Sequence, residues 1–334
     1  MTGVERLQST GIIRIGTPQR GFRYRCADGG RVVSEDLQRI RHLRIPPAWI
    51  NVAISSSPAA KVQAVGVDTA GRWQYLYHEN HTKLRAQVKY RRLIHFIEVL
   101  PQMRITVARH LRQPDLGRER ILACIVRVLS TCFFRPGSEV YASENGSYGI
   151  ATLKPRHVVV RGNLVRFDFR GKSGVLQTRE FSDRHVARVL KELLKCRNSE
   201  VFKFRSEDGQ FVDVKRRHIN EYIKEAMGER FSAKDFRTWA GTMVCACALA
   251  RIGTDESDDA VSRKRKIADA IKETSLTLGN TPAVCRSSYI CPEVIENFQK
   301  GRTIKHFFPG SEAFISYRGT KLHRSERALL RLLK

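Results

Sequence analysis

Four short segments of the chain carry a phenol, an ammonium group and two guanidiniums in settings that could do chemistry. The stretch LGNTPAVCRSSYICPEVI (278–295) holds one tyrosine, Tyr289, among small residues, two cysteines and an arginine. Arg135 lies in FFRPGSEV, Lys172 in the glycine-flanked GKSG and Arg237 in KDFRTW. A phenol of pKa about 10 is mostly protonated at neutral pH, so it reacts as a nucleophile only where its surroundings favour the phenolate. Neighbouring guanidiniums would favour that form and would also bind an anionic substrate.

Each of these residues also has an ordinary interpretation. Arg237 could be a helical surface arginine, Lys172 a solvated loop lysine and Tyr289 a core aromatic. A threonine followed by proline is typical of a helix start, which makes Thr281 the expected N-cap. This pattern predicts Tyr289 about two turns into a helix and Asn280 just outside its N-terminus.

The charge of the chain indicates a polyanionic partner. Sixty Lys and Arg residues against 33 Asp and Glu leave a formal net charge of +27 over 334 residues. Nucleic acid is favoured over a membrane surface, because the basic residues are spread along the chain and no basic amphipathic segment or lipidation signal stands out. A ribosome-associated or simply cationic protein is the alternative.

The rest of the composition is typical of a protein with an ordinary reduced core. Apolar residues make up 42% of the chain, and no run approaches the length of a membrane span. The N-terminus lacks the pattern of a signal peptide, so we expect a cytoplasmic protein, associated with the nucleoid in a bacterium and nuclear in a nucleated cell. The eight cysteines contain no C-x-x-C pair, which favours buried reduced thiols over zinc ligands or disulfides.

Residues 1–88 predict a small antiparallel sheet that forms an N-terminal domain. Alternating or β-branched runs bounded by turn residues occur at GIIRI (11–15), GFRYRC (21–26), KVQAVGVD (61–68) and RWQYLYH (72–78). Between them, SEDLQRIRHLRI (34–45) predicts a short helix capped by Ser34 and ended by two prolines.

Residues 89–334 predict a larger, mainly helical domain, because apolar residues recur three and four positions apart from about residue 83 onward. One hairpin interrupts the helices, HVVVRGNLVRFDF (157–169), with a tight turn at Gly162-Asn163. VLQTREF (175–181) is a candidate third strand, and Ser182 is the expected cap of the next helix. The predicted fold class is therefore α+β, with a β-rich N-terminal domain and a helical domain that contains a three-stranded antiparallel sheet.

Five segments, taken in order, resemble one family: the type IB DNA topoisomerases of the compact kind found in poxviruses and bacteria. FFRPGSEVYASENGSYGIATLKPRHV (133–158) resembles the family's first arginine segment, and FDFRGKSG (167–174) resembles its lysine turn. KDFRTWAGT (234–242) is similar to its second arginine helix, and LGNTPAVCRSSY (278–289) to its tyrosine segment. GRWQYLYH (71–78) looks like the Q-Y-x-Y element with which the small domain of the family contacts DNA.

The resemblance implies four catalytic residues, which are Arg135, Lys172, Arg237 and Tyr289. A fifth family position is often histidine and is Asn280 here. No histidine lies between His218 and His306, so a shifted alignment does not supply one. An asparagine amide can donate a hydrogen bond to a phosphate oxygen, but it cannot carry charge or a transferable proton.

The implied activity is relaxation of supercoiled duplex DNA without ATP. Tyr289 would attack phosphorus, leave a 3′-phosphotyrosyl bond and then reverse the step, with Lys172 protonating the leaving 5′-oxygen. Neither a cofactor nor a metal ion is required. The resemblance further implies a monomer that closes as a clamp around double-stranded DNA. The expected DNA contacts are Gln74, Tyr75, Tyr77, Tyr141, Lys154 and Arg156.

Two alternatives stay open at this point. A tyrosine recombinase or integrase shares the catalytic fold and nearly the same residue set, but it usually has histidine where this chain has Asp235, and its N-terminal domain is helical. A non-catalytic DNA-binding protein of the same fold would leave DNA topology unchanged. In the N-terminal segment, Tyr75 and Tyr77 could also pack within a sheet instead of touching DNA.

Overall fold

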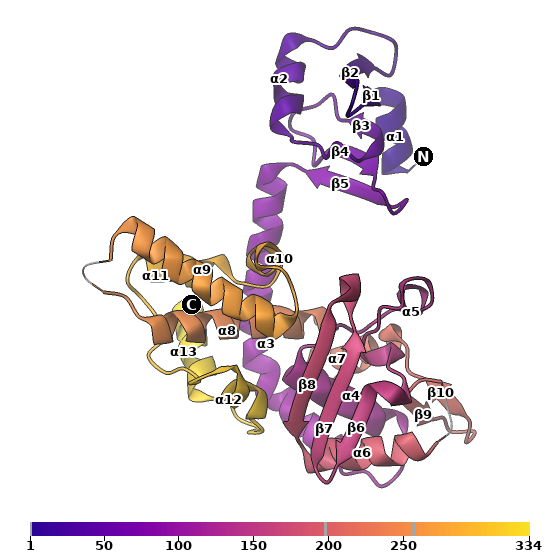
Figure 1. Ribbon diagram of the computed structural model, residues 1–334, viewed down its shortest axis with the longest axis vertical. Helices are drawn as coiled ribbons and strands as arrows, with labels where there is room; N and C mark the ends of the chain where they lie inside the picture. Colours follow the sequence, from indigo (N-terminus) through magenta and orange to yellow (C-terminus); the bar gives the residue numbers. More distant parts are fainter. Residues whose placement is uncertain (1, 197–198, 256–257) are drawn as a thin grey trace. The chain divides into compact units, whose positions relative to one another are not determined.

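The computed structural model describes residues 2–196, 199–255 and 258–334 (Figure 1). The chain forms two compact units, Met1–Lys89 and Tyr90–Lys334. No helix among the described residues is long and apolar enough to cross a membrane.

The first unit is built on an antiparallel sheet, as the sequence predicted, but it has five strands where four were expected. Its strand order is β2-β1-β3-β4-β5. The strands are β1 (Ile12–Thr17), β2 (Gly21–Cys26), β3 (Ile50–Ile54), β4 (Val62–Val67) and β5 (Trp73–Tyr77). Strand β3 was not singled out from the sequence, because its run INVAI follows two prolines and a tryptophan without a clear period-2 pattern.

Two helices accompany this sheet. Helix α1 (Gly3–Thr10) was not predicted; it begins with a capping box in which Thr2 and Glu5 exchange side-chain and backbone hydrogen bonds. Helix α2 (Ser34–His42) was predicted, but its N-cap is Val33, so Ser34 lies in the first turn.

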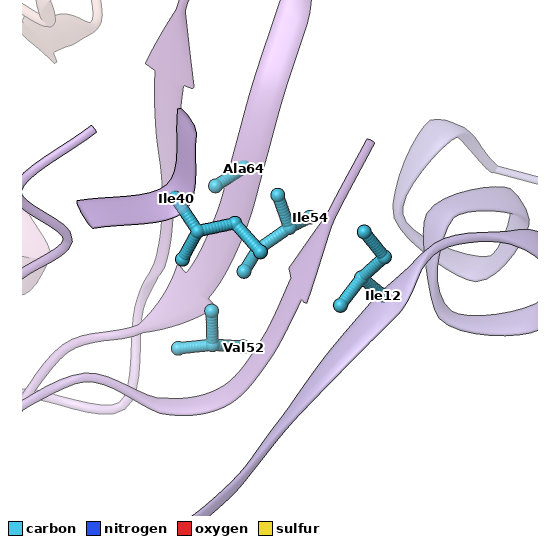
Figure 2. Packing of buried hydrophobic residues seen from close by; sticks show 5 residues of the cluster. All are labelled: Ile12, Ile40, Val52, Ile54 and Ala64. Atoms are coloured by element: carbon cyan, nitrogen blue, oxygen red, sulfur yellow. The ribbon is translucent and has the colours of Figure 1, made fainter. Parts of the chain in front are cut away.

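The core of the first unit is small and aliphatic. Figure 2 shows five of its buried residues, which are Ile12, Ile40, Val52, Ile54 and Ala64. Ile40 is the buried residue of α2, and Leu76 of β5 packs against the same cluster. Because side chains alternate along a strand, the inward position of Leu76 sends its two neighbours to the opposite face.

The second unit is mainly helical. Helix α3 (Glu79–His110) begins in the first unit and continues into the second. The other helices are α4 (Arg118–Cys132), α5 (Glu139–Asn145), α6 (Arg184–Lys195), α7 (Arg216–Met227), α8 (Ala233–Ile252), α9 (Ala260–Leu278), α10 (Pro282–Ser288), α11 (Pro292–Gln299), α12 (Ser311–Ser316) and α13 (Arg324–Leu333). Helix α8 is buried along nearly its whole length, including its polar residues, which makes it the central element that other helices pack around.

The predicted three-stranded sheet lies in the second unit with the order β6-β7-β8. Its strands are β6 (Val158–Arg161), β7 (Leu164–Arg170) and β8 (Leu176–Ser182). The two-residue turn at Gly162-Asn163 is confirmed, and Val165, Phe167 and Phe169 of β7 point into the core. Ser182 ends β8 instead of capping α6, because Asp183 accepts hydrogen bonds from the backbone of His185 and Val186. A second hairpin, β9 (Lys203–Arg205) and β10 (Phe211–Asp213), was not predicted.

Six of the eight cysteines are buried. Cys245 and Cys247 lie inside α8, where burial raises the pKa of the Cys245 thiol to about 12 and that of Cys247 to about 11. These thiols stay protonated at neutral pH and behave as small apolar side chains.

Candidate active site

Arg237 lies on the central helix α8 and is 2% exposed. Its guanidinium donates hydrogen bonds to the carbonyl of Phe133 and, at 2.9 Å, to that of Leu278. Phe133 adopts a left-handed conformation (φ 58°) that ends α4. Burial, assisted by the charge of Arg135, lowers the pKa of Arg237 to about 10, so the guanidinium is still charged at neutral pH. Its two carbonyl partners fix the group and leave other N–H donors for a ligand.

Tyr289 lies against this guanidinium. The side chain is 8% exposed, and the guanidinium carbon of Arg237 is 4.9 Å from the centroid of its ring. Burial by itself would raise the pKa of Tyr289, but interaction with Arg237, together with the charges of Arg135 and Lys234, outweighs it and lowers that pKa. The phenolate is therefore easier to form at this position than in a free tyrosine.

The structure corrects the expected backbone position of Tyr289. Helix α10 does begin at Pro282, and Thr281 caps it by accepting a hydrogen bond from Val284 N at 3.3 Å, as predicted. The helix ends at Ser288, so Tyr289 is its C-cap (φ −132°, ψ −17°) and does not lie within it. Pro292 prevents α10 from continuing past residue 291, because it has no N–H and disfavours helical geometry in the preceding residue, but the last helical residue lies four positions earlier.

Two hydroxyl groups hold the backbone around the tyrosine. Thr242 Oγ1 donates to the carbonyl of Tyr289 and accepts from Cys291 N, both at 3.1 Å. The Tyr90 hydroxyl donates to the carbonyl of Ile290 at 2.7 Å. Gly241 allows the close approach, because a Cβ there would lie 2.9 Å from both the Cβ and the carbonyl oxygen of Tyr289. Helix α8 thus positions Tyr289 in two ways. Gly241 and Thr242 contact the backbone of the tyrosine, and Arg237, one helical turn earlier, contacts its ring.

Arg135 and Asn280 meet across 145 residues of sequence. The Arg135 guanidinium donates to Asn280 Oδ1. Asn280 Nδ2 is buried and has no hydrogen-bond partner among the described residues. The amide lies near the Cys285 thiol and opposes the larger effect of burial, which raises the pKa of that thiol. The backbone of Arg135 is held in turn by Ile150 N, which donates to its carbonyl at 2.9 Å. With its oxygen engaged by Arg135, the amide of Asn280 can offer N–H groups to an anion.

Lys172 lies on the turn between β7 and β8. Gly171 N donates to the carbonyl of Val175 at 2.8 Å, and both Ser173 (φ 61°) and Gly174 (φ 74°) adopt left-handed conformations. The lysine side chain is exposed and makes no hydrogen bond or ion pair within the described ranges. The structure therefore brings together four of the five expected catalytic residues and leaves the lysine on an exposed turn.

Asp235 has a structural role in this chain. Its carboxylate accepts from the N–H and hydroxyl of Ser232 at 2.9 and 2.8 Å, which caps α8, and it pairs with Arg92 at 2.8 Å. A carboxylate committed to these partners cannot replace the histidine that recombinases usually have at this position.

The Q-Y-x-Y segment forms β5 of the first unit. Tyr75 is 43% exposed and Tyr77 is 37% exposed, so the interpretation that they pack inside a sheet is wrong. Gln74 is half-buried and donates to Asp68 at 2.8 Å. Two further residues lie here that were not singled out from the sequence. Trp73 is exposed on the same face, and the Arg85 guanidinium lies 5.4 Å from the Tyr77 ring centroid. The period-2 alternation of β5 was sufficient to identify Trp73.

The expected DNA contacts of the second unit differ in how exposed their side chains are. Arg156 is exposed and donates to the Tyr148 hydroxyl at 3.2 Å. Lys154 is half-buried, and its backbone N–H donates to His157 Nδ1 at 3.0 Å. Tyr141 belongs to α5, but its side chain lies outside the described residues.

Comparisons with known proteins agree with this arrangement. Residues 79–307 match the family described as eukaryotic DNA topoisomerase I, catalytic core, and residues 21–68 match the bacterial DNA topoisomerase IB N-terminal domain. DNA topoisomerase 1B of Acanthamoeba polyphaga mimivirus is 33% identical over 296 residues, which are 86% of this chain and 88% of the relative. DNA topoisomerase 1B of vaccinia virus (strain Copenhagen) is 26% identical over 263 residues, covering 77% and 80% of the two chains.

The family match covers most of the second unit, including all the residues around Tyr289, and the bacterial N-terminal match falls on the sheet of the first unit. The chain therefore belongs to the type IB DNA topoisomerases of the compact viral and bacterial kind, the enzymes that relax supercoiled DNA.

Proposed function

We propose that this enzyme relaxes DNA by a reversible transesterification at Tyr289 that uses neither ATP nor a metal ion. The observation that carries the proposal is the phenol of Tyr289 against the buried guanidinium of Arg237, with its pKa lowered by that charge in spite of burial. A phenol activated in this way is suited to attack phosphorus.

The step is balanced within the protein and the DNA. The phenol loses its proton to solvent, its oxygen forms a bond to phosphorus, and the bond from phosphorus to the 5′-oxygen breaks. The leaving 5′-oxygen takes a proton from the Lys172 ammonium, which gives a 3′-phosphotyrosyl bond and a free 5′-hydroxyl. Religation is the reverse step, and relaxation occurs while the cut strand swivels about the intact one.

Arg237, Arg135 and Asn280 are proposed to bind the non-bridging phosphate oxygens. Negative charge grows on those oxygens in the transition state, so donors fixed in advance stabilise it more than the ground state. Removal of one such donor costs about 3 kcal/mol in comparable oxyanion sites. The proposal is supported by the hydrogen bonds that hold both arginines and by the unpaired amide nitrogen of Asn280.

DNA binding is proposed to involve both units of a monomer that closes as a clamp around the duplex. In the first unit, Gln74, Tyr75 and Tyr77 would contact the duplex. In the second unit, Lys154, Arg156 and Tyr141 would contact phosphates. The support is the exposed aromatic face of β5 and the net charge of +27. Because the substrate is DNA, we expect the protein in the cytoplasm, at the nucleoid in a bacterium.

Supercoiled plasmid incubated with the protein in EDTA without ATP tests this function. We expect a ladder of relaxed topoisomers from negatively and positively supercoiled plasmid alike. A denaturing quench should trap a protein–DNA adduct at the 3′ end of the cut strand. Plasmid that stays supercoiled while it is bound would indicate a non-catalytic protein, and inversion or deletion products would indicate a recombinase. A strict requirement for ATP or a divalent cation would contradict the proposed chemistry.

A further inference from the structure

Gln177 is a buried polar side chain wedged between two glycines that are far apart in the sequence. It lies on β8 and is 6% exposed. A Cβ at Gly171 would lie 2.9 Å from Gln177 Cγ, and a Cβ at Gly279 would lie 2.7 Å from its Oε1 and closer still to its Nε2. Since real Cβ atoms do not approach so closely, both positions exclude any larger residue while Gln177 keeps this place.

The two glycines adjoin residues of the proposed mechanism. Gly171 immediately precedes Lys172 on the turn between β7 and β8. Gly279 immediately precedes Asn280 and ends α9 in a left-handed conformation (φ 59°). Asn280 N donates to the carbonyl of Ser275 at 3.0 Å and so closes the turn at the end of α9, which is called the Asn280 corner below. Gln177 therefore touches the backbone on the two sides of the site that carry the lysine and the asparagine.

A second side chain of β8 binds the same corner. Arg179 follows Gln177 by two positions and so lies on the same face of the strand. Its guanidinium donates to the carbonyl of Thr277 and, at 3.5 Å, to that of Leu276. These carbonyls belong to the last turn of α9, and that of Leu276 also accepts from Gly279 N at 3.3 Å. The middle of the β7–β8 hairpin is thus attached to α9 through Arg179, whereas its turn, with Lys172, is exposed.

We propose that Gln177 is a positioning residue that sets the Lys172 turn in register with the Asn280 corner. When the Gln177 side chain lies between the two glycines, Lys172 reaches the 5′-oxygen of the same phosphate that Asn280 and Arg237 bind. Gln177 acts mainly by its shape, since within the described part of the chain its amide makes one hydrogen bond, from Nε2 to the carbonyl of Leu176 at 3.3 Å. This inference rests on the proposed function and adds a residue that does not itself touch DNA.

The test compares single-turnover cleavage of an ordinary DNA strand with that of a strand whose 5′-bridging oxygen is replaced by sulfur. The sulfur leaves readily without a proton, so it removes the need for Lys172. In Gln177→Ala we expect cleavage of the ordinary strand to slow by roughly ten- to a hundredfold, as for a misplaced catalytic group. On the sulfur strand, both Gln177→Ala and Lys172→Ala should recover most of the lost cleavage rate.

Three further variants separate positioning from a general structural effect. Gln177→Met keeps the length and volume of the side chain and should cleave close to the parent rate. Thr178→Ala, on the exposed face of the same strand, is the matched control and should have no effect. The double variant Lys172→Ala/Gln177→Ala should cleave no more slowly than Lys172→Ala, because both changes remove the same proton transfer. If Gln177→Ala does not fold, Gln177→Asn, which shortens the side chain by one methylene, provides the same comparison of the ordinary and sulfur strands.

Each outcome decides between the proposals. Equal slowing of Gln177→Ala on both strands, or additive losses in the double variant, would overturn the positioning role while leaving the proposed function intact. If the sulfur strand does not restore cleavage by Lys172→Ala, Lys172 is not the general acid, and the proposed role of Gln177 is wrong as well. If the unaltered protein forms no adduct at all, the proposed function itself is wrong.

Discussion

Asn280 offers the sharpest test of the proposed active site, because its two amide atoms have separable roles. Its Oδ1 accepts from Arg135, whereas its Nδ2 is buried without a partner among the described residues and is proposed to donate to a phosphate oxygen. Asn280→Ala removes both interactions. Loss of one buried hydrogen bond costs about 1 to 3 kcal/mol, which corresponds to about ten- to more than a hundredfold in the rate of cleavage.

Asn280→Asp distinguishes the two roles. The carboxylate keeps an acceptor for Arg135 and binds a guanidinium more strongly than an amide does. If Asn280 only orients Arg135, this variant should cleave at least as fast as the parent. If Asn280 donates to the phosphate, the variant loses that donor and adds negative charge beside an anion, so it should be slower than Asn280→Ala.

Asn280→His should retain most of the activity, since imidazole can donate from nearly the same place. Its cleavage rate should change with pH near 6 to 7, the range in which histidine titrates, whereas the parent should show no inflection from this position. Single-turnover cleavage across pH 5 to 9 for the parent and the three variants measures all these effects. Unimpaired cleavage by Asn280→Ala would show that the residue only shapes the start of α10.

Tyr289→Phe removes one oxygen, so it should fold and bind DNA but form no adduct under a denaturing quench; an adduct in this variant would mean that the nucleophile is another residue. Thr242→Val removes the hydroxyl that joins the Tyr289 carbonyl to Cys291 N. It should lower the free energy of unfolding by about 1 to 3 kcal/mol in denaturant titrations, whereas Thr242→Ser should retain most of the stability. Tyr75→Ala and Tyr77→Ala should weaken DNA binding without affecting the fold, as measured by fluorescence anisotropy and circular dichroism, because both rings are exposed. If roughly six to ten phosphates are neutralised, affinity for duplex DNA should fall by about 10³ to 10⁵ between about 50 and 200 mM salt, and a flat response would contradict an encircling clamp.

Local patterns in the sequence predicted the elements that depend on neighbouring residues. The tight turn at Gly162-Asn163 and the alternation of β5 follow from rules that act over a few residues, and both are present in the structure. Thr281 caps α10 for the same reason. Some errors fall at boundaries, where adjacent residues compete, whereas α1, β3 and the β9–β10 hairpin were not predicted at all. Asp183, not Ser182, caps α6, because a carboxylate next to the serine accepts two backbone N–H groups.

The end of α10 depended on contacts that are distant in the sequence. A proline at 292 was visible, but the hydroxyls of Thr242 and Tyr90 that bind the carbonyls of residues 289 and 290 come from other helices. These partners satisfy the carbonyls outside a helix, so Tyr289 can leave helical geometry without an unpaired buried group.

The amino-acid sequence was sufficient to predict the types of residue available for chemistry, their order along the chain, the basic charge and, through the resemblance, the family. The folded chain was needed to see that Arg237 donates to two carbonyls beside the phenol, that Arg135 binds Asn280, and that Gln177 lies between two glycines. Propensity, capping and periodicity act between near neighbours, so they do not predict such contacts. The pKa of a buried phenol or guanidinium depends on which side chains the packed core brings within a few ångströms of it.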